Sequence, residues 1–173
     1  MTAVGGTTTE SDGASETAIG FSSGGFSNRW PQPDWQRAAV AAYLRRNESL
    51  PPASRGYNTS GRAYPDVAAQ STHFNVVTNL IPQSGIAGTS ASAPTVAAVV
   101  AMLNDVRLAH NKSSVGFINP VIYAHPEIWN DITQGRSTGC DMDGWPAGRG
   151  WDAVTGCGTP NFSKLVGLVL ALP

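Results

Sequence analysis

A run of small and apolar residues between positions 90 and 110 constrains the fold of this chain more than any other feature. Alanines and valines occupy every side of the helix that this run would form, so no polar stripe is left to face water. Pro94 fits the first helical turn, where a missing amide N–H costs nothing. The run therefore predicts a buried helix, which other elements have to cover.

The segments around this run predict one α/β unit over residues 1–173. Asp34 opens an amphipathic helical pattern, which Leu50 and the two prolines after it end. Asn161 is placed to cap a last helix that runs to Leu172. Short strands are expected at residues 2–4, 67–69 and 74–77, a further helix at 117–125, and loops at 53–65 and 126–160.

Composition excludes several classes of protein. The formal charge is −1 and the pI is about 6.3, which argues against a nucleic-acid partner. Charged residues make up only 13% of the chain, so it is neither a solvated disordered segment nor a coiled coil. The longest apolar stretch, residues 165–172, falls far short of the roughly 20 residues that insertion across a membrane needs.

Four Asn-x-Ser/Thr tripeptides favour a secretory route, and they begin at Asn47, Asn58, Asn111 and Asn161. The first residues have neither a basic start nor a long apolar stretch, so no signal peptide is expected on this chain. The two observations together lead us to expect an upstream part of the protein before residue 1.

The segment 88–94, Gly-Thr-Ser-Ala-Ser-Ala-Pro, places Ser90 at the start of the predicted helix. The helix dipole there stabilises a developing negative charge, and the Ser90 amide has no helical partner and can donate to an oxyanion. Small neighbours leave room for a substrate strand. The structural alternative is an ordinary serine cap, which is common at helix starts. Ser90 is the candidate catalytic nucleophile.

This serine segment resembles the signature of the sedolisins, the serine-carboxyl peptidases. The resemblance continues through four further blocks in the same order along the chain, whereas subtilisins share Gly-Thr-Ser but continue with Met-Ala. The form Arg-Ala-Tyr-Pro-Asp-Val at 62–67 is most similar to the lysosomal tripeptidyl-peptidase branch. The four blocks lie at residues 2–7, 23–36, 61–69 and 150–162.

The resemblance implies a subtilisin-like α/β fold, a parallel sheet flanked by helices, of which this chain is an N-terminally truncated part. It also implies hydrolysis of peptide or protein substrates at acidic pH through a Ser90 acyl-enzyme, in a monomeric lysosomal or secreted protein with tripeptidyl-peptidase activity as one form. In the family a glutamate base, its supporting aspartate and an oxyanion aspartate lie upstream of the strand that begins here at residue 2. The alternative is therefore a catalytically inactive, calcium-stabilised fragment or isoform.

No other residues of the chain replace those acids. Glu127 and Asp131 have the i, i+4 spacing of a helical dyad, but Pro126 and Asn130 argue for a loop or helix end. The histidines at positions 73, 110 and 125 fall in no block that supports a Ser–His pair. Asp66 is expected to be a buried structural acid that pairs with Arg62 or with backbone amides.

The same resemblance implies one Ca²⁺ ion. Calcium prefers several oxygen ligands, among them carboxylates and backbone carbonyls. The family pattern falls on the carboxylates of Asp131 and Asp152 and on the carbonyls of Ile132, Gly148 and Gly150. Asp141 and Asp143, which lie between the two halves of this set, are expected to be surface acids.

Two cysteines, Cys140 and Cys157, neither demand nor exclude a disulfide. Cys140 either pairs with Cys157, which would pin the calcium loop, or pairs with a cysteine outside this chain.

Overall fold

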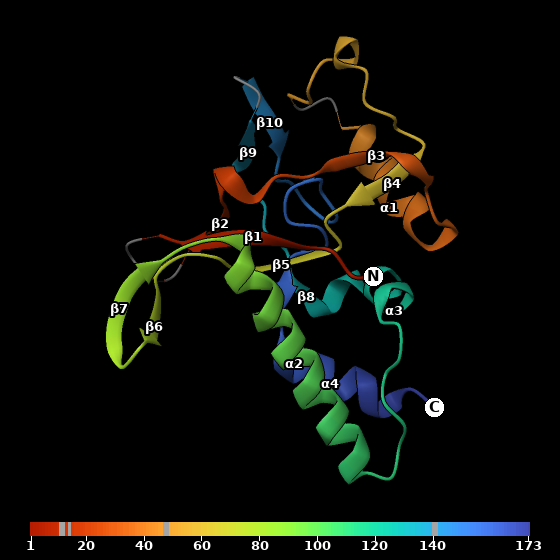
Figure 1. The fold of residues 1–173 in the computed structure, drawn as a ribbon. Helices are drawn as coiled ribbons and strands as arrows, with labels where there is room; N and C mark the ends of the chain where they lie inside the picture. Colours follow the sequence, from red (N-terminus) through yellow and green to blue (C-terminus); the bar gives the residue numbers. More distant parts are fainter. Residues whose placement is uncertain (11–12, 14, 47–48, 140–141) are drawn as a thin grey trace.

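A computed structural model of the chain describes residues 1–173 except 11–12, 14, 47–48 and 140–141. The predicted α/β class is confirmed: strands and helices are mixed along the chain, and a small central sheet lies between helices (Figure 1). None of the described helices is long and apolar enough to cross a membrane.

The central sheet has the order β2-β1-β5. Strands β1 (Val4–Thr9) and β5 (Val67–Gln70) run parallel, with Val4 opposite Val67, and β2 (Glu16–Ala18) pairs antiparallel with the end of β1. The predicted strand at residues 2–4 overlaps β1 at one residue only, because β1 begins at Val4. Its glycines are required by close neighbours, since a Cβ atom on Gly6 would lie 2.6 Å from the Ser71 hydroxyl oxygen.

Among the described residues, four two-stranded ladders accompany this sheet. The expected loops at 53–65 and 126–160 are wrong in part. Residues 61–64, 129–130 and 159–160 pair with segments about 30 or more residues away, which no local pattern shows, whereas 136–139 and 142–146 form a local hairpin. The ladders join β3 (Gly25–Pro31) to β4 (Gly61–Tyr64), β6 (Phe74–Thr78) to β7 (Ile81–Ile86), β9 (Arg136–Gly139) to β10 (Met142–Pro146), and β8 (Trp129–Asn130) to β11 (Thr159–Pro160).

Four α-helices and three short 3-10 turns complete the described fold. Helix α1 ends well before the predicted boundary, and α3 is shorter than predicted, whereas α4 begins after the predicted Asn161 cap, whose Oδ1 accepts from the Lys164 amide. The helices are α1 (Asp34–Leu44), α2 (Thr89–Ala109), α3 (Asn119–Ala124) and α4 (Phe162–Ala171), and the turns are η1 (Gly20–Ser22), η2 (Ala53–Arg55) and η3 (Pro126–Ile128).

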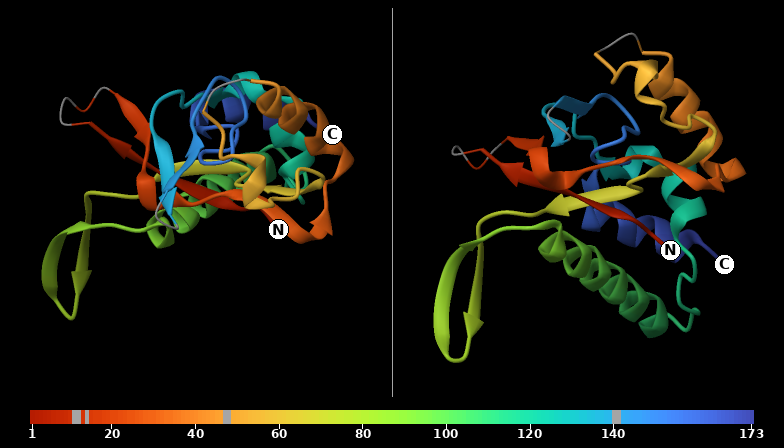
Figure 2. Two further views of the ribbon diagram at one scale, coloured as in Figure 1. Left: turned by 90° about the horizontal axis from the view of Figure 1, so that it is seen from above. Right: turned by 45° about the horizontal axis from the view of Figure 1, so that its top comes forward.

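Helix α2 occupies the predicted run, but the prediction that it is buried on every side is wrong for this structure. Only Ser92, Val96, Leu103 and Arg107 are buried along it, and 49% of Met102 is exposed. One side of α2 packs on β1, β5 and α4, while Figure 2 shows the other side facing outward. The alanine-rich helix is thus covered on one side only, by the central sheet and α4.

The hydrophobic core joins the central sheet to all four α-helices and to the segment that follows β10. It is rich in aromatic side chains: the Tyr43 ring stands edge-on to Trp151 at 5.4 Å between centroids, and Tyr57 does the same to Trp145 at 4.8 Å. Aromatic pairs of this kind add about 0.5–1.5 kcal/mol beyond their buried area. This cluster holds the 145–157 segment against the sheet and so fixes the loop of the predicted calcium ligands.

Candidate active site

Ser90 lies in the first turn of α2, on the solvent side of the helix. The turn before it depends on Gly88, whose φ of 149° is disfavoured for residues with a side chain and whose amide donates to the Ser71 carbonyl at 2.7 Å. Neither the amide nor the hydroxyl of Ser90 has a hydrogen-bond partner within the described part of the chain. Both groups are therefore free to meet a ligand.

The position of this first turn is fixed by the central sheet. The Ser92 hydroxyl donates to the carbonyl of Gln70 at the end of β5, at 3.1 Å. On the other side Thr89 packs against Gly6 of β1, where a Cβ atom would lie 3.2 Å from the Thr89 methyl. Ser90 is thus held rigidly at the carboxyl end of the parallel pair, the usual position of functional residues in α/β folds.

A base for Ser90 is not found among the described residues. His73 is exposed and its Nδ1 lies 3.1 Å from the Thr72 hydroxyl, while His110 bonds to the Val106 carbonyl of its own helix. His125 lies 3.3 Å from Glu127. The expectation that no histidine pairs with Ser90 agrees with these contacts, and an isolated serine hydroxyl is a weak nucleophile.

Glu127 and Asp131 do not form a dyad on one helix. Glu127 lies in the short turn η3, and Asp131 follows β8, so the chain between them is not helical throughout. The Asp131 carboxylate accepts from the Gly150 amide at 2.8 Å. Asp131 therefore belongs to the loop expected to bind calcium.

Asp66 is the most completely buried acid of the described structure besides Asp152, and its pairing with Arg62 is confirmed. Arg62 Nη2 donates to both Asp66 oxygens at 2.7 and 2.6 Å, and the Ala3 amide and the Tyr123 hydroxyl donate to them as well. Burial, together with the nearby Asp66 carboxylate, holds the pKa of Tyr123 well above its ordinary value.

Two partners of this network were not expected from the sequence. Gln36, fully buried on α1, bonds both backbone groups of Ala63 at 2.9 Å and donates to Tyr123 at 2.6 Å. Arg62 in turn stacks on the ring of Trp35 at 5.1 Å. A glutamine at a core position of an amphipathic helix was the available signal, because a buried amide needs polar partners.

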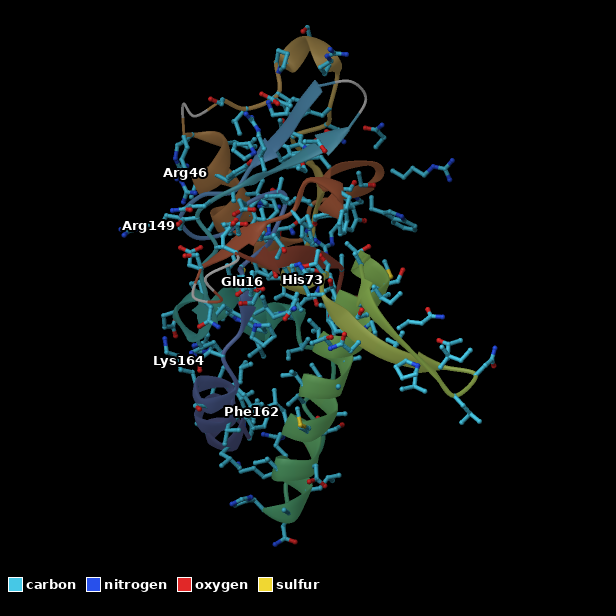
Figure 3. All side chains as sticks on the ribbon, turned by 90° about the vertical axis from the view of Figure 1, so that its left-hand side faces the viewer. Glu16, Arg46, His73, Arg149, Phe162 and Lys164 are labelled. Carbon is cyan, nitrogen blue, oxygen red and sulfur yellow. The ribbon has the colours of Figure 1, made fainter. Side chains whose placement is uncertain are left out.

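The two carboxylates among the predicted calcium ligands lie near the two predicted glycine ligands. Asp131 bonds the Gly150 amide, and Asp152 Oδ2 accepts from the Gly148 amide at 3.0 Å, so both carboxylates lie against the 148–150 segment. Gly150 has a φ of 75°, which favours glycine. Arg46 approaches this segment, and Figure 3 places Arg46 and Arg149 on the same edge of the molecule.

The donor chemistry of this loop fits a hard cation. The carbonyl oxygens of Ile132, Gly148 and Gly150 accept no hydrogen bond from any described residue. Asp152 is fully buried, and burial raises the pKa of its carboxyl to about 7 although five N–H and O–H contacts favour the charged form. The described ranges contain no group of three or more His, Cys, Asp or Glu side chains suited to a metal, so such a site would rest on two carboxylates and on carbonyls.

Of the other residues expected near this loop, the structure describes Asp143 and Cys157. Asp143 is an exposed acid, 2.9 Å from Arg136, as expected for a surface position. Cys157 is a buried free thiol whose pKa is raised by burial. Cys140 and Asp141 lie outside the described residues, so the pairing of Cys140 stays a prediction.

Comparison with known proteins gives relatives of one kind. The chain is 47% identical to the tripeptidyl-peptidase sed1 of Aspergillus fumigatus over 164 residues, and 42% identical to tripeptidyl-peptidase 1 of Rattus norvegicus over 178 residues. These alignments cover 88% and 98% of this chain. The chain belongs to the sedolisin family. No family model matches it.

A solved sedolisin supports the same assignment at the level of the fold. The Pseudomonas sedolisin, a serine-carboxyl proteinase solved in complex with two molecules of pseudo-iodotyrostatin, superposes with a TM-score of 0.73 at 26% identity. The alignment covers 99% of this chain and 46% of the sedolisin chain. Against the two tripeptidyl-peptidases the share is smaller still, since the chain spans 25% and 31% of their lengths.

Proposed function

We propose that this chain is the serine-bearing part of a sedolisin-type peptidase, and that the complete enzyme cleaves peptide bonds at acidic pH. The observation that carries the proposal is Ser90 itself: an exposed hydroxyl with a free amide at the start of a long helix, held against the sheet by Gly88 and Ser92. The relatives are named as tripeptidyl-peptidases, which favours release of tripeptides as the form of the activity.

The chemistry assigned to Ser90 is nucleophilic acyl transfer. Its Oγ attacks the carbonyl carbon of the scissile bond, the hydroxyl proton passes to a carboxylate base, and the leaving amine takes up a proton as the C–N bond breaks. The Ser90 amide and the positive end of α2 stabilise the negative charge on the carbonyl oxygen. Water then hydrolyses the acyl-enzyme. The carboxylate base is assigned to a glutamate upstream of this chain.

One Ca²⁺ ion is proposed at the 131–152 loop. The carboxylates of Asp131 and Asp152 and the carbonyls of Ile132, Gly148 and Gly150 would hold it. The ion would neutralise the buried Asp152 charge and order the loop, because carbonyl oxygens without donors are costly when buried. Its role in this proposal is structural, since none of the described loop residues hydrogen-bonds to Ser90.

The peptidase proposal is tested by Ser90→Ala in the intact protein that carries this sequence. Cleavage of a tripeptide-amide substrate at acidic pH should fall about 1,000-fold or more, since no other nucleophile lies at the site. Ser113→Ala is the control, because it removes an exposed serine hydroxyl beyond the far end of α2. Turnover of Ser90→Ala close to that of the wild type would overturn the assignment.

The second candidate is an inactive, calcium-stabilised protein, and one observation favours it. Ser90 meets no acid or imidazole among the residues described here. A fluorophosphonate probe separates the two candidates: the peptidase proposal expects labelling of Ser90 in the intact protein and none in the 173-residue chain alone. Secretory or lysosomal delivery, peptide substrates and a monomeric state belong to the same proposal.

A further inference from the structure

Arg46 follows the end of α1 and reaches the loop that carries the predicted calcium ligands. Its amide donates to the Tyr43 carbonyl at 3.0 Å, which anchors the backbone to the last turn of the helix. A Cβ atom placed on Gly150 would lie 3.4 Å from Arg46 Nη2, and the Gly150 amide donates to the Asp131 carboxylate at 2.8 Å. A guanidinium group therefore lies beside the residue that one of the two acids of the loop holds.

The positive charge of Arg46 has no acid of its own. None of the ion pairs among the described residues includes Arg46, although Arg37 and Arg62 each have an aspartate partner. Arg46 Nη1 is buried, and no acceptor within the described part of the chain bonds to it. A charged donor that is buried without an acceptor is costly and uncommon. Such a group is expected to lie where nearby negative charge compensates it.

The charge of Arg46 and the second acid of the loop act on the same phenol. The Tyr43 hydroxyl donates to the Pro146 carbonyl at 3.0 Å. Burial raises the pKa of Tyr43, the Asp152 carboxylate acts in the same direction, and Arg46 acts against both. Arg46 and Asp152 therefore lie within electrostatic reach of one side chain.

We propose that Arg46 is a built-in counter-charge of the 131–152 loop, which offsets the carboxylates of Asp131 and Asp152 when calcium is absent and opposes calcium when it binds. The inference rests on the proposed calcium ion and adds to it a residue that sets the affinity. Like charges repel more strongly where water is excluded, and the ion would share the loop with a fixed positive charge. The loop should therefore keep its shape without the ion and bind the ion less tightly than the five ligands alone would.

The test removes the charge by Arg46→Gln in the intact protein that carries this sequence. In calorimetric titration of the calcium-depleted protein, the Kd for calcium should fall about 3- to 10-fold, the scale on which one unit charge acts on a divalent ion at short range. Arg45→Gln is the matched control, because Arg45 is the adjacent residue, is exposed and carries the same charge. Its Kd should stay within about 2-fold of the wild type, since salt screens exposed charges.

A second variant, Arg46→Lys, separates charge from shape. Lysine keeps the positive charge but lacks the planar fork of arginine. Its Kd for calcium should therefore stay close to that of the wild type. A Kd as low as that of Arg46→Gln would show that the charge of Arg46 is not what weakens binding, and would overturn the inference.

Melting in the presence of a chelator reads the ion-free loop without any catalysis. Arg46→Gln should melt below Arg45→Gln, because two carboxylates then lose a compensating charge, and calcium should raise its melting temperature more. If calcium stabilises the wild type but Arg46→Gln matches Arg45→Gln in Kd and in melting, the counter-charge is refuted and the calcium ion stands. If calcium binds neither the wild type nor any variant, the calcium proposal fails and this inference fails with it, whatever the Ser90→Ala result.

Discussion

At the scale of single residues, the Arg62–Asp66 pair is the most deeply buried ion pair in the described part of the chain. Both side chains are nearly inaccessible, with 9% and 0% of their surface exposed, and Asp66 also holds the Ala3 amide of the first strand. Removing one partner of such a pair leaves an uncompensated buried charge, which costs far more than the pair contributes.

Asp66→Asn should therefore lower the free energy of unfolding by about 3–5 kcal/mol. Asp34→Asn is the control, because its pair with Arg37 is equally short at 2.6 Å but exposed, and such pairs contribute about 1 kcal/mol at most. Urea unfolding of both variants measures the difference. Similar losses in the two variants would show that burial of the Arg62–Asp66 pair is not what makes it important.

Tyr123 gives a second residue-scale prediction, at alkaline pH. Burial and the Asp66 charge raise the pKa of this phenol, so the unfolded chain ionises near pH 10 while the folded chain stays protonated. Stability that is present below pH 10 is then lost as pH rises above it. Tyr123→Phe should make this decline shallower in melting experiments between about pH 9 and 11.5, on either side of the ordinary tyrosine pKa. An unchanged slope would contradict the assignment.

Residues whose roles depend on short local patterns could be predicted from the sequence, and residues whose partners lie far along the chain could not. Ser90, Asp66 and the Asn161 cap follow from short local patterns, and each lies where it was expected. Gln36 was missed because a polar residue in an amphipathic pattern is ordinarily placed on the wet side. Its partner groups on Ala63 come from a strand whose pairing depends on a distant segment.

At the scale of elements, α4 depends on its first turn. Asn161 Oδ1 accepts from the Lys164 amide at 3.3 Å and its Nδ2 donates to Asn130 at 3.1 Å, so one side chain both caps the helix and ties it to β8. The helix buries Leu165 and Val169 against the core. The packing of α4 against the core therefore depends on a correctly capped first turn.

Asn161→Ala should cost about 1 kcal/mol of stability, the usual loss when a cap is removed. Asn161→Asp should keep most of the cap, because a carboxylate also accepts from the Lys164 amide and interacts favourably with the helix dipole. Thermal melting of the two variants checks the order. If Asn161→Asp melted no higher than Asn161→Ala, the cap would not explain the loss.

Element boundaries show where local reasoning ends. The strand at 74–77 and the helix at 117–125 were expected close to their observed places, since both rely on nearby residues. The small strands β4, β8 and β11 were not, because each pairs with a segment about 30 or more residues away. The one-sided cover of α2 was missed for the same reason: burial depends on which layers are present around the helix, and the composition of the helix does not reveal that.

At the scale of the whole molecule, the proposed calcium ion links the 131–152 loop to the aromatic core. Asp152 receives five N–H and O–H contacts, so the loop is already partly organised around one acid. A cation that binds only the folded protein stabilises it by RT ln(1 + [ion]/Kd), about 2.7 kcal/mol at an ion concentration of 100 times its Kd.

Removal of calcium by a chelator should therefore lower the melting temperature of the intact protein by several degrees. Asp152→Asn, which keeps the shape and removes one charge, should melt lower in calcium and respond less to the chelator. Asp143→Asn is the control, because that acid is exposed and pairs with Arg136. If chelation left all three melting curves in place, the loop would bind no ion of consequence.

The first strand has a consequence for how this chain reaches its fold. β1 pairs with β5 at a sequence separation of 63 residues, Ser22 bonds the Val154 carbonyl across 132 residues, and Glu16 meets Thr159 across 143. Such a high contact order predicts slow folding, because loop-closure entropy is lost before the pairing is gained. During synthesis, β1 leaves the ribosome before its parallel neighbour β5 exists, so one edge of β1 stays open until residues 67–70 have been made. A strand whose partner is made this much later depends on cellular chaperones to shield its open edge during that interval.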